Sequence, residues 1–164
     1  MKALKNNKLS KTLKMATAAG ALLLSSLSFA ASINLNNNDV AIHGYDPVAY
    51  FTNNQAVEGM PKFTANYEGA IYHFASESNR DRFKADPERY APQFGGYCAM
   101  GVVMNKKFDI DPEAFYIVDN KLYMNLNKDV QKRWLTDTSG HIKSADRIWN
   151  GIENLSVAAV NDEE

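Results

Sequence analysis

The clearest structural signal in the chain is the stretch at residues 67–90, YEGAIYHFASESNRDRFKADPERY. Apolar and polar residues alternate on both sides of the turn at Glu68-Gly69, and this pattern predicts a β-hairpin over residues 63–74. Ser76 then offers a hydroxyl that can cap the free N–H groups of a helix, and Asp86-Pro87 has the cap and the proline typical of another helix start. The stretch therefore predicts a hairpin followed by two short helices.

The same two signals recur on either side of this stretch. Asp46-Pro47 and Asp111-Pro112 have the same capping pair, so we expect a short helix to begin at each. Residues 115–126, FYIVDNKLYMNL, consist of two β-rich halves around Asp119-Asn120, which predicts a second hairpin. The residues show no internal repeat and no break in composition, so we expect one domain at 39–155.

Two helices are expected after the second hairpin, because apolar residues recur there at helical spacing. The first carries Leu126, Val130 and Trp134, and the second carries Ile142, Ala145, Trp149 and Ile152. Hairpins interleaved with helices indicate the α+β class. The expected fold is a small antiparallel sheet from two hairpins, packed with short helices and two C-terminal helices.

The two ends of the chain differ in character from this domain. Residues 1–30 begin with five lysines and no acid, continue as an apolar stretch and end in Ser28-Phe29-Ala30, which is the pattern of a cleaved signal peptide. We therefore expect export by general secretion, to the periplasm if the host has two membranes and otherwise to the extracellular space. Residues 31–38 are expected to form a polar linker, and residues 156–164 a disordered acidic tail.

The charge of the exported chain argues against two classes of partner. Without residues 1–30 it has 13 basic and 19 acidic residues, a balance of −6. This disfavours nucleic acid and anionic membrane surfaces as partners. The chain has a single cysteine, Cys98, so no disulfide can form within it.

Three stretches together resemble the YHS-domain family, in a longer exported form with C-terminal helices. They are HGYDPVAYF at 43–51, YEGAIYHFASESNRDRFKADPERYAPQFGGYCAMGV at 67–102 and DPEAFYIVDNKLYMNLN at 111–127. Short YHS domains are found in metal-handling proteins, including copper pumps, and typically carry cysteines. The resemblance implies the YHS fold and a role in metal handling, while the three cysteine positions are occupied here by Ala49, Ala75 and Asn79.

Three other side chains are candidate metal ligands in this chain. His43, His73 and Cys98 have the imidazole and thiolate donors that suit copper, and the fold would have to assemble them from three segments. The first functional hypothesis is therefore an exported, non-catalytic, copper-type metal-binding protein. Its site would lie under the loop GGYCAMG at 95–101, where the thiol loses its proton when metal binds.

The second functional hypothesis needs no metal. Cys98 would be a buried core residue, and the chain would bind a small ligand or a protein partner that the sequence does not identify. The candidate ligand-binding residues around the glycine loop are Tyr45, Asp46, Tyr97 and Met100.

An enzyme is not favoured by the sequence. Cys98 with a histidine would supply a nucleophile and a base. The second glycine, Gly101, comes one residue too late after Cys98 for the Gly-x-nucleophile-x-Gly turn of acyl-transfer enzymes, however.

Overall fold

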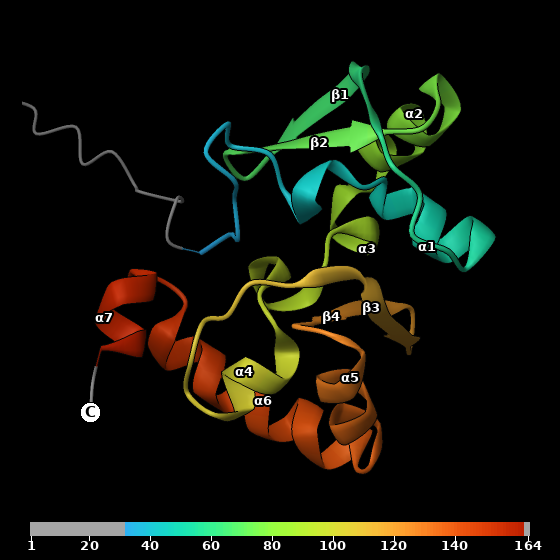
Figure 1. Ribbon diagram of the computed structural model, residues 1–164. Helices are drawn as coiled ribbons and strands as arrows, with labels where there is room; N and C mark the ends of the chain where they lie inside the picture. Colours follow the sequence, from blue (N-terminus) through green and yellow to red (C-terminus); the bar gives the residue numbers. More distant parts are fainter. Residues whose placement is uncertain (1–31, 163–164) are drawn as a thin grey trace, which may run out of the picture.

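The computed structural model describes residues 32–162, so the expected signal peptide at 1–30 lies outside the described residues. The first half of the fold consists of η2 (Ile42–Gly44), α1 (Pro47–Asn53), β1 (Met60–Tyr67), β2 (Ala70–Phe74), α2 (Glu77–Ala85) and α3 (Pro87–Tyr90). The second half consists of η3 (Gln93–Gly96), α4 (Ala99–Val103), β3 (Asp111–Val118), β4 (Lys121–Asn125), α5 (Lys128–Leu135), α6 (Thr138–Ile152) and α7 (Val157–Asn161). The α+β class is confirmed, with helices at the C-terminal end (Figure 1).

Both predicted hairpins are present, and they form two separate two-stranded antiparallel sheets. A short parallel bridge lies on the outer side of β2 and another on the outer side of β4. The first comes from the segment before α1, and the second from the residue before α4. Val40 pairs with Ile71 of β2, and Cys98 pairs with Met124 of β4. These bridges occupy part of the outer edges of β2 and β4.

The two hairpins belong to two copies of one structural unit, which the sequence analysis did not detect. The strands β3 and β4 begin and end 51 residues after β1 and β2, and every register pair is displaced by the same 51 residues. The irregularity in pairing also recurs, between Met60 and Thr64 in the first hairpin and between Asp111 and Phe115 in the second. The two hairpins thus share both their strand register and the position of the irregularity. Such agreement extends along the whole hairpin and is not explained by similar turns alone.

A left-handed turn begins each unit. Residues Ile42–Gly44 have φ values of 49°, 52° and 84°, and residues Phe94–Gly96 have φ values of 55°, 58° and 79°. The N–H of the following tyrosine bonds to the first carbonyl of the turn, at 2.9 Å from Tyr45 and 3.0 Å from Tyr97. We call residues 42–85 the first unit and residues 94–135 the second unit.

The repeat is hard to see in the sequence. Corresponding positions of the two units often have the same structural role but carry different amino acids. Ser76 caps α2 and Asn127, 51 residues later, caps α5. Phe83 and Trp134 are separated by the same 51 residues and are both buried. Caps and core positions tolerate several residue types, so the same backbone is encoded by two different sequences.

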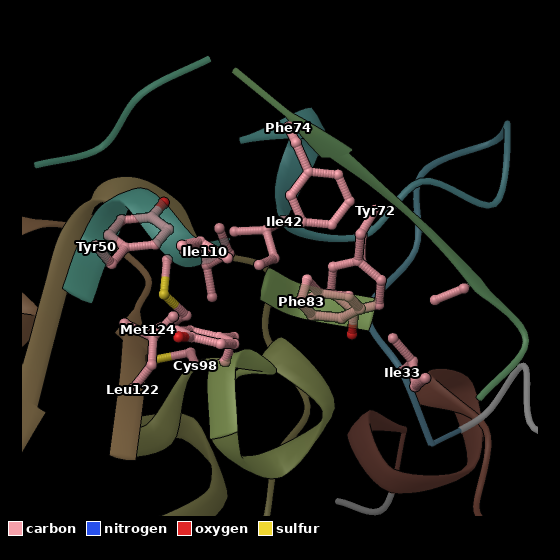
Figure 2. Close-up of a cluster of buried hydrophobic side chains, with 14 residues drawn as sticks. Ile33, Ile42, Tyr50, Tyr72, Phe74, Phe83, Cys98, Ile110, Leu122 and Met124 are labelled. Atoms are coloured by element: carbon pink, nitrogen blue, oxygen red, sulfur yellow. The ribbon is translucent and has the colours of Figure 1, made fainter. Parts of the chain in front are cut away.

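Two hydrophobic clusters hold the chain together. The first joins the first unit to Cys98, Leu122 and Met124 of the second unit (Figure 2). The second lies under α6 and α7 and includes Trp134, Ala145, Ile152 and Val160. The α6 positions predicted to face inward contribute to this second cluster. Across residues 32–162, no helix is both long enough and apolar enough to cross a membrane.

One of the three predicted helix starts is wrong. Helices begin after Asp46 and after Asp86 as predicted, but Asp111-Pro112 opens the strand β3. The Asp111 carboxylate accepts the N–H of Glu113 in a short turn, and β-forming residues follow at 114–118. The tertiary pairing of Asp111 with Asn125 in the hairpin overrides the local capping signal.

The two end segments, expected to be a polar linker and a disordered tail, each contain a buried apolar residue. In the expected linker, Ile33 is buried and the N–H of Asn34 bonds to the Gly95 carbonyl at 2.8 Å. In the expected acidic tail, Ser156 caps α7 and Val160 is buried. Burial of one apolar side chain in each segment stabilises its packing against the core.

We predict that Asn161→Ala destabilises the protein by about 1.5 kcal/mol, because the side chain bonds to both backbone groups of one buried residue. Its Oδ1 accepts the Lys107 N–H at 3.0 Å, and its Nδ2 donates to the Lys107 carbonyl at 2.9 Å. Urea denaturation measures the difference, and the exposed Asp162→Ala is the matched control. Equal stability of the two variants would show that the Asn161 hydrogen bonds to Lys107 do not stabilise the protein.

Candidate functional site

Cys98 is the N-cap residue of α4 and lies in the first hydrophobic cluster. Its side chain is 1% exposed, and Sγ accepts the N–H of Gly101 at 3.3 Å and of Leu126 at 3.2 Å. Burial raises the pKa of the thiol, although the backbone N–H groups act in the opposite direction. Figure 2 shows the thiol beside Met124 and Leu122. The lone cysteine therefore performs a structural task at this position.

Asp46 occupies the corresponding position in the first unit. It is the N-cap residue of α1, is fully buried, and accepts four hydrogen bonds through its two carboxylate oxygens. Oδ1 accepts the N–H groups of Val48 at 2.8 Å and Ala49 at 3.3 Å. Oδ2 accepts the Ala75 N–H at 2.9 Å and the Asn79 amide at 2.7 Å. Asp46 and Cys98 thus tie the first helix of each unit to the residue after its hairpin.

The Asp46 carboxylate is also the point at which the three expected thiol positions meet. Ala49 and Ala75 donate their backbone N–H groups to it, and Asn79 donates its side-chain amide. A carboxylate has about four acceptor positions, so four donors satisfy this buried group. The resemblance to the YHS family predicts thiol ligands at these three positions. In this chain the positions contain no thiol and instead donate hydrogen bonds to Asp46.

His43 lies on the left-handed turn of the first unit and pairs with an acid from the second. Its Nε2 is 2.8 Å from Oδ1 of Asp109, and the side chains are 39% and 60% exposed. The same carboxylate oxygen accepts the Asn34 amide and the Ile110 N–H, each at 2.8 Å. Burial acts to raise the pKa of Asp109, but the hydrogen bonds from Asn34, Ile110 and His43 together lower it.

His73 lies in β2 between the buried Tyr72 and Phe74, so its ring faces away from the core as the alternation predicts. Burial lowers the pKa of this half-buried ring. The ring packs against Gly44, where a Cβ would lie 3.3 Å from Nδ1.

The structure does not bring His43, His73 and Cys98 together as a ligand set. Within residues 32–162, no group of three or more His, Cys, Asp or Glu side chains is placed to hold a metal ion. The thiol faces the core, while His43 is already paired and exposed at the surface. The residues present therefore do not fit a copper site built from these three donors.

The four candidate ligand-binding residues also have other roles or positions. Asp46 caps α1, and the buried Tyr97 donates its hydroxyl to the Ile33 carbonyl at 3.3 Å. Met100 and Tyr45 are half-buried and pack against the core clusters. None of the four lines the cavity described next.

A cavity of about 700 Å³ lies between the two units and α6, and it is open to solvent on the side of its charged lining residues. Its lining includes the side chains of Tyr67, Glu68, Glu88, Phe94, Asp146 and Trp149. Tyr67 and Glu68 are at the turn of the first hairpin, and Lys121 enters the cavity from the start of β4, next to the turn of the second. The sequence analysis missed this site because its residues come from five separate segments.

The aromatic wall of the cavity is held in place from behind. Trp149 packs against Phe94, with ring centroids 5.9 Å apart, and against Tyr97 at 6.1 Å. The Nζ of the buried Lys107 lies 5.1 Å from the ring centroids of Tyr97 and Trp149. It also donates to the Glu153 and Leu155 carbonyls at 2.9 and 2.7 Å, after the end of α6. Lys107 therefore contacts both the aromatic wall at Trp149 and the backbone at Glu153 and Leu155, and it holds the two in place.

Comparison with known families finds one match. Residues 48–94 match the family model of the YHS domain. The matched residues cover α1 to α3, and this part of the chain is similar to a YHS domain. The family is often linked to the handling of metals, copper in particular. Most of the second unit and the C-terminal helices lie beyond the matched residues, which is consistent with the longer form of the family. The chain matches no curated protein and no solved structure.

We predict that Asp46→Ala destabilises the protein by about 3 kcal/mol, because it leaves the buried N–H donors of Ala75 and Asn79 without their acceptor. Asp86→Ala is the matched control, since that cap accepts one exposed hydrogen bond and should cost about 1 kcal/mol. Urea denaturation of both variants measures the two losses. A smaller loss at Asp46 than at Asp86 would contradict its central role.

Burial of Lys107 gives the stability a defined pH dependence. Burial lowers the pKa of Lys107 to about 8 from its ordinary 10.5, although the Glu153 carboxylate acts to raise it. Between these two values the unfolded chain binds more protons than the folded chain, so this lysine makes stability rise with pH. Below pH 8 both states are protonated and the folded state bears the full cost of the buried ammonium.

We therefore predict that the stability of the wild-type protein, relative to Lys107→Met, rises between pH 8 and pH 10. Urea denaturation at a series of pH values measures the difference between the two proteins. The exposed Lys143→Met is the control and should give a flat difference. A flat difference for Lys107→Met would show that the ammonium is equally stable in both states.

Proposed function

We propose that this chain is an exported, non-catalytic YHS protein that binds a small organic ligand in the cavity between its two units. The cavity carries this proposal. Its volume of about 700 Å³ falls in the range of small-molecule sites, and it lies at an interface between structural units, where such sites concentrate. Export is supported by the lysine-rich and apolar pattern of residues 1–30.

The family's link to metals makes a copper site the competing function. The donor set argues against it in this chain. Copper(I) favours thiolate and thioether ligands, and the one thiol is buried with a raised pKa and two hydrogen bonds to its sulfur. The three positions expected to carry thiols surround Asp46 instead. A metal-handling role would have to use donors other than His43, His73 and Cys98.

The metal question is tested by titrating residues 31–164, reduced, with copper(I) and with zinc. Metal content and Cys98 thiol reactivity are measured on the same sample. We expect no stoichiometric binding of either metal, and a thiol that reacts with a labelling reagent only after unfolding. Stoichiometric copper(I) binding that is lost in Cys98→Ser would overturn the proposal in favour of the metal site.

The ligand question is tested by blocking the cavity. Asn150 lines the cavity from the exposed side of α6, so Asn150→Trp should fill it without disturbing a core contact. Arg147→Trp, on an exposed α6 position outside the lining, is the matched control. Fragments of positive, neutral and negative charge are screened by NMR chemical shift changes. We expect at least one to bind the wild type and Arg147→Trp but not Asn150→Trp.

A further inference from the structure

We infer that the ligand of this cavity is an organic cation, with an ammonium group on an aromatic or apolar body. The inference rests on the proposed function and adds the chemical class of the ligand. Two features of the walls point to a cation: an aromatic surface and an excess of carboxylates. A third feature, the spacing of the carboxylates, points to an organic cation and not to a metal ion.

The aromatic surface consists of Trp149, Phe94 and Tyr67. A cation within about 6 Å of an aromatic ring centroid is attracted by the negative face of the ring, and Trp gives the strongest attraction. The protein already uses Trp149 in this way, because the amine of Lys107 lies 5.1 Å from its ring centroid. The contacts with Phe94 and Tyr97 fix the Trp149 ring before any ligand arrives, so binding loses little side-chain entropy there.

The charged groups of the cavity are mostly negative. Glu68, Glu88, Asp146 and Glu153 contribute four carboxylates, against one lysine at 121. Burial and then the Glu68 and Glu88 charges raise the pKa of Tyr67, so both carboxylates act on the same wall.

Glu68 shares a side-chain hydrogen bond with Tyr67, and Glu153 lies near the Lys107 charge. Among the residues that the structure describes, Glu68, Glu88 and Asp146 take part in no ion pair. Lys121 offsets only part of the negative charge that lines the cavity, and a positive ligand would balance the remainder.

The spacing of the acids excludes the simplest alternative, a bare metal ion. Divalent cations need several oxygen ligands within a few ångströms of one point. Within residues 32–162, no three acidic, histidine or cysteine side chains come that close, so the cavity carboxylates are distributed around its walls. Distributed charges around an aromatic surface match a cation that carries its charge on an extended organic body.

The experiment uses three indoles of the same size that differ in charge at pH 7: tryptamine is positive, tryptophol is neutral and indole-3-acetate is negative. Binding to residues 31–164 is measured by NMR chemical shift titration. We expect tryptamine to bind about tenfold more tightly than tryptophol, with shifts centred on Trp149, and indole-3-acetate to bind most weakly. Added salt should weaken tryptamine binding and leave tryptophol unchanged.

Isosteric variants separate the charges from the fold. Glu68→Gln combined with Asp146→Asn removes two exposed carboxylates and no core contact, and it should lower the tryptamine affinity to that of tryptophol. Glu113→Gln, an exposed acid outside the cavity, is the matched control and should leave the affinity unchanged.

The outcomes distinguish the inference from the proposed function on which it rests. Equal binding of tryptamine and tryptophol at Trp149, or tighter binding of indole-3-acetate there, would overturn the cation and leave a ligand site. No binding of any of the three at the cavity, together with none in the fragment screen, would overturn both. Tight tryptamine binding that survives in the double variant would place the cation elsewhere on the protein and overturn the inference.

Discussion

Each unit of this protein depends on one buried acceptor at the N-terminus of its first helix. In the first unit the carboxylate of Asp46 binds N–H groups from α1 and from the residue after β2. In the second unit the sulfur of Cys98 binds N–H groups from α4 and from the residue after β4. A helix end and a strand end both leave backbone donors without partners, and a single side chain satisfies both. The remaining structure of each unit is arranged around this cross-link.

The same interaction explains why the single cysteine needs no partner thiol and no metal. A sulfur is a weak acceptor, but in a dry core it is adequate for two backbone donors and adds apolar contact with Met124 and Leu122. The first unit uses a charged acceptor instead, and it has Asn79 to satisfy the extra capacity of a carboxylate. Val130, 51 residues after Asn79, has no such donor, so an uncharged acceptor suits the second unit.

Much of the local structure follows from short-range signals. Both hairpins, the caps at Asp46, Ser76 and Asp86, and the inward residues of α6 were readable because turn chemistry and periodicity act over a few residues. The exceptions share a cause. Asp111-Pro112 carries a helix-start signal but is held in a strand by pairing with distant residues, and α7 is ordered by the burial of Val160. The sequence indicates candidate metal ligands only by their donor type, which contains no information on which side chains lie close together.

The sequence by itself determined the α+β class, the two hairpins and the YHS character of residues 48–94, because these depend on local patterns. Only the tertiary structure decided that the chain contains the same unit twice, since capping and core roles were kept while most residues changed. It also decided that Cys98 is buried in the first hydrophobic cluster and forms no ligand set with His43 and His73. Finally, it assembled the cavity from turns, loops and α6, whose closeness arises from the packing of the two units and not from any motif.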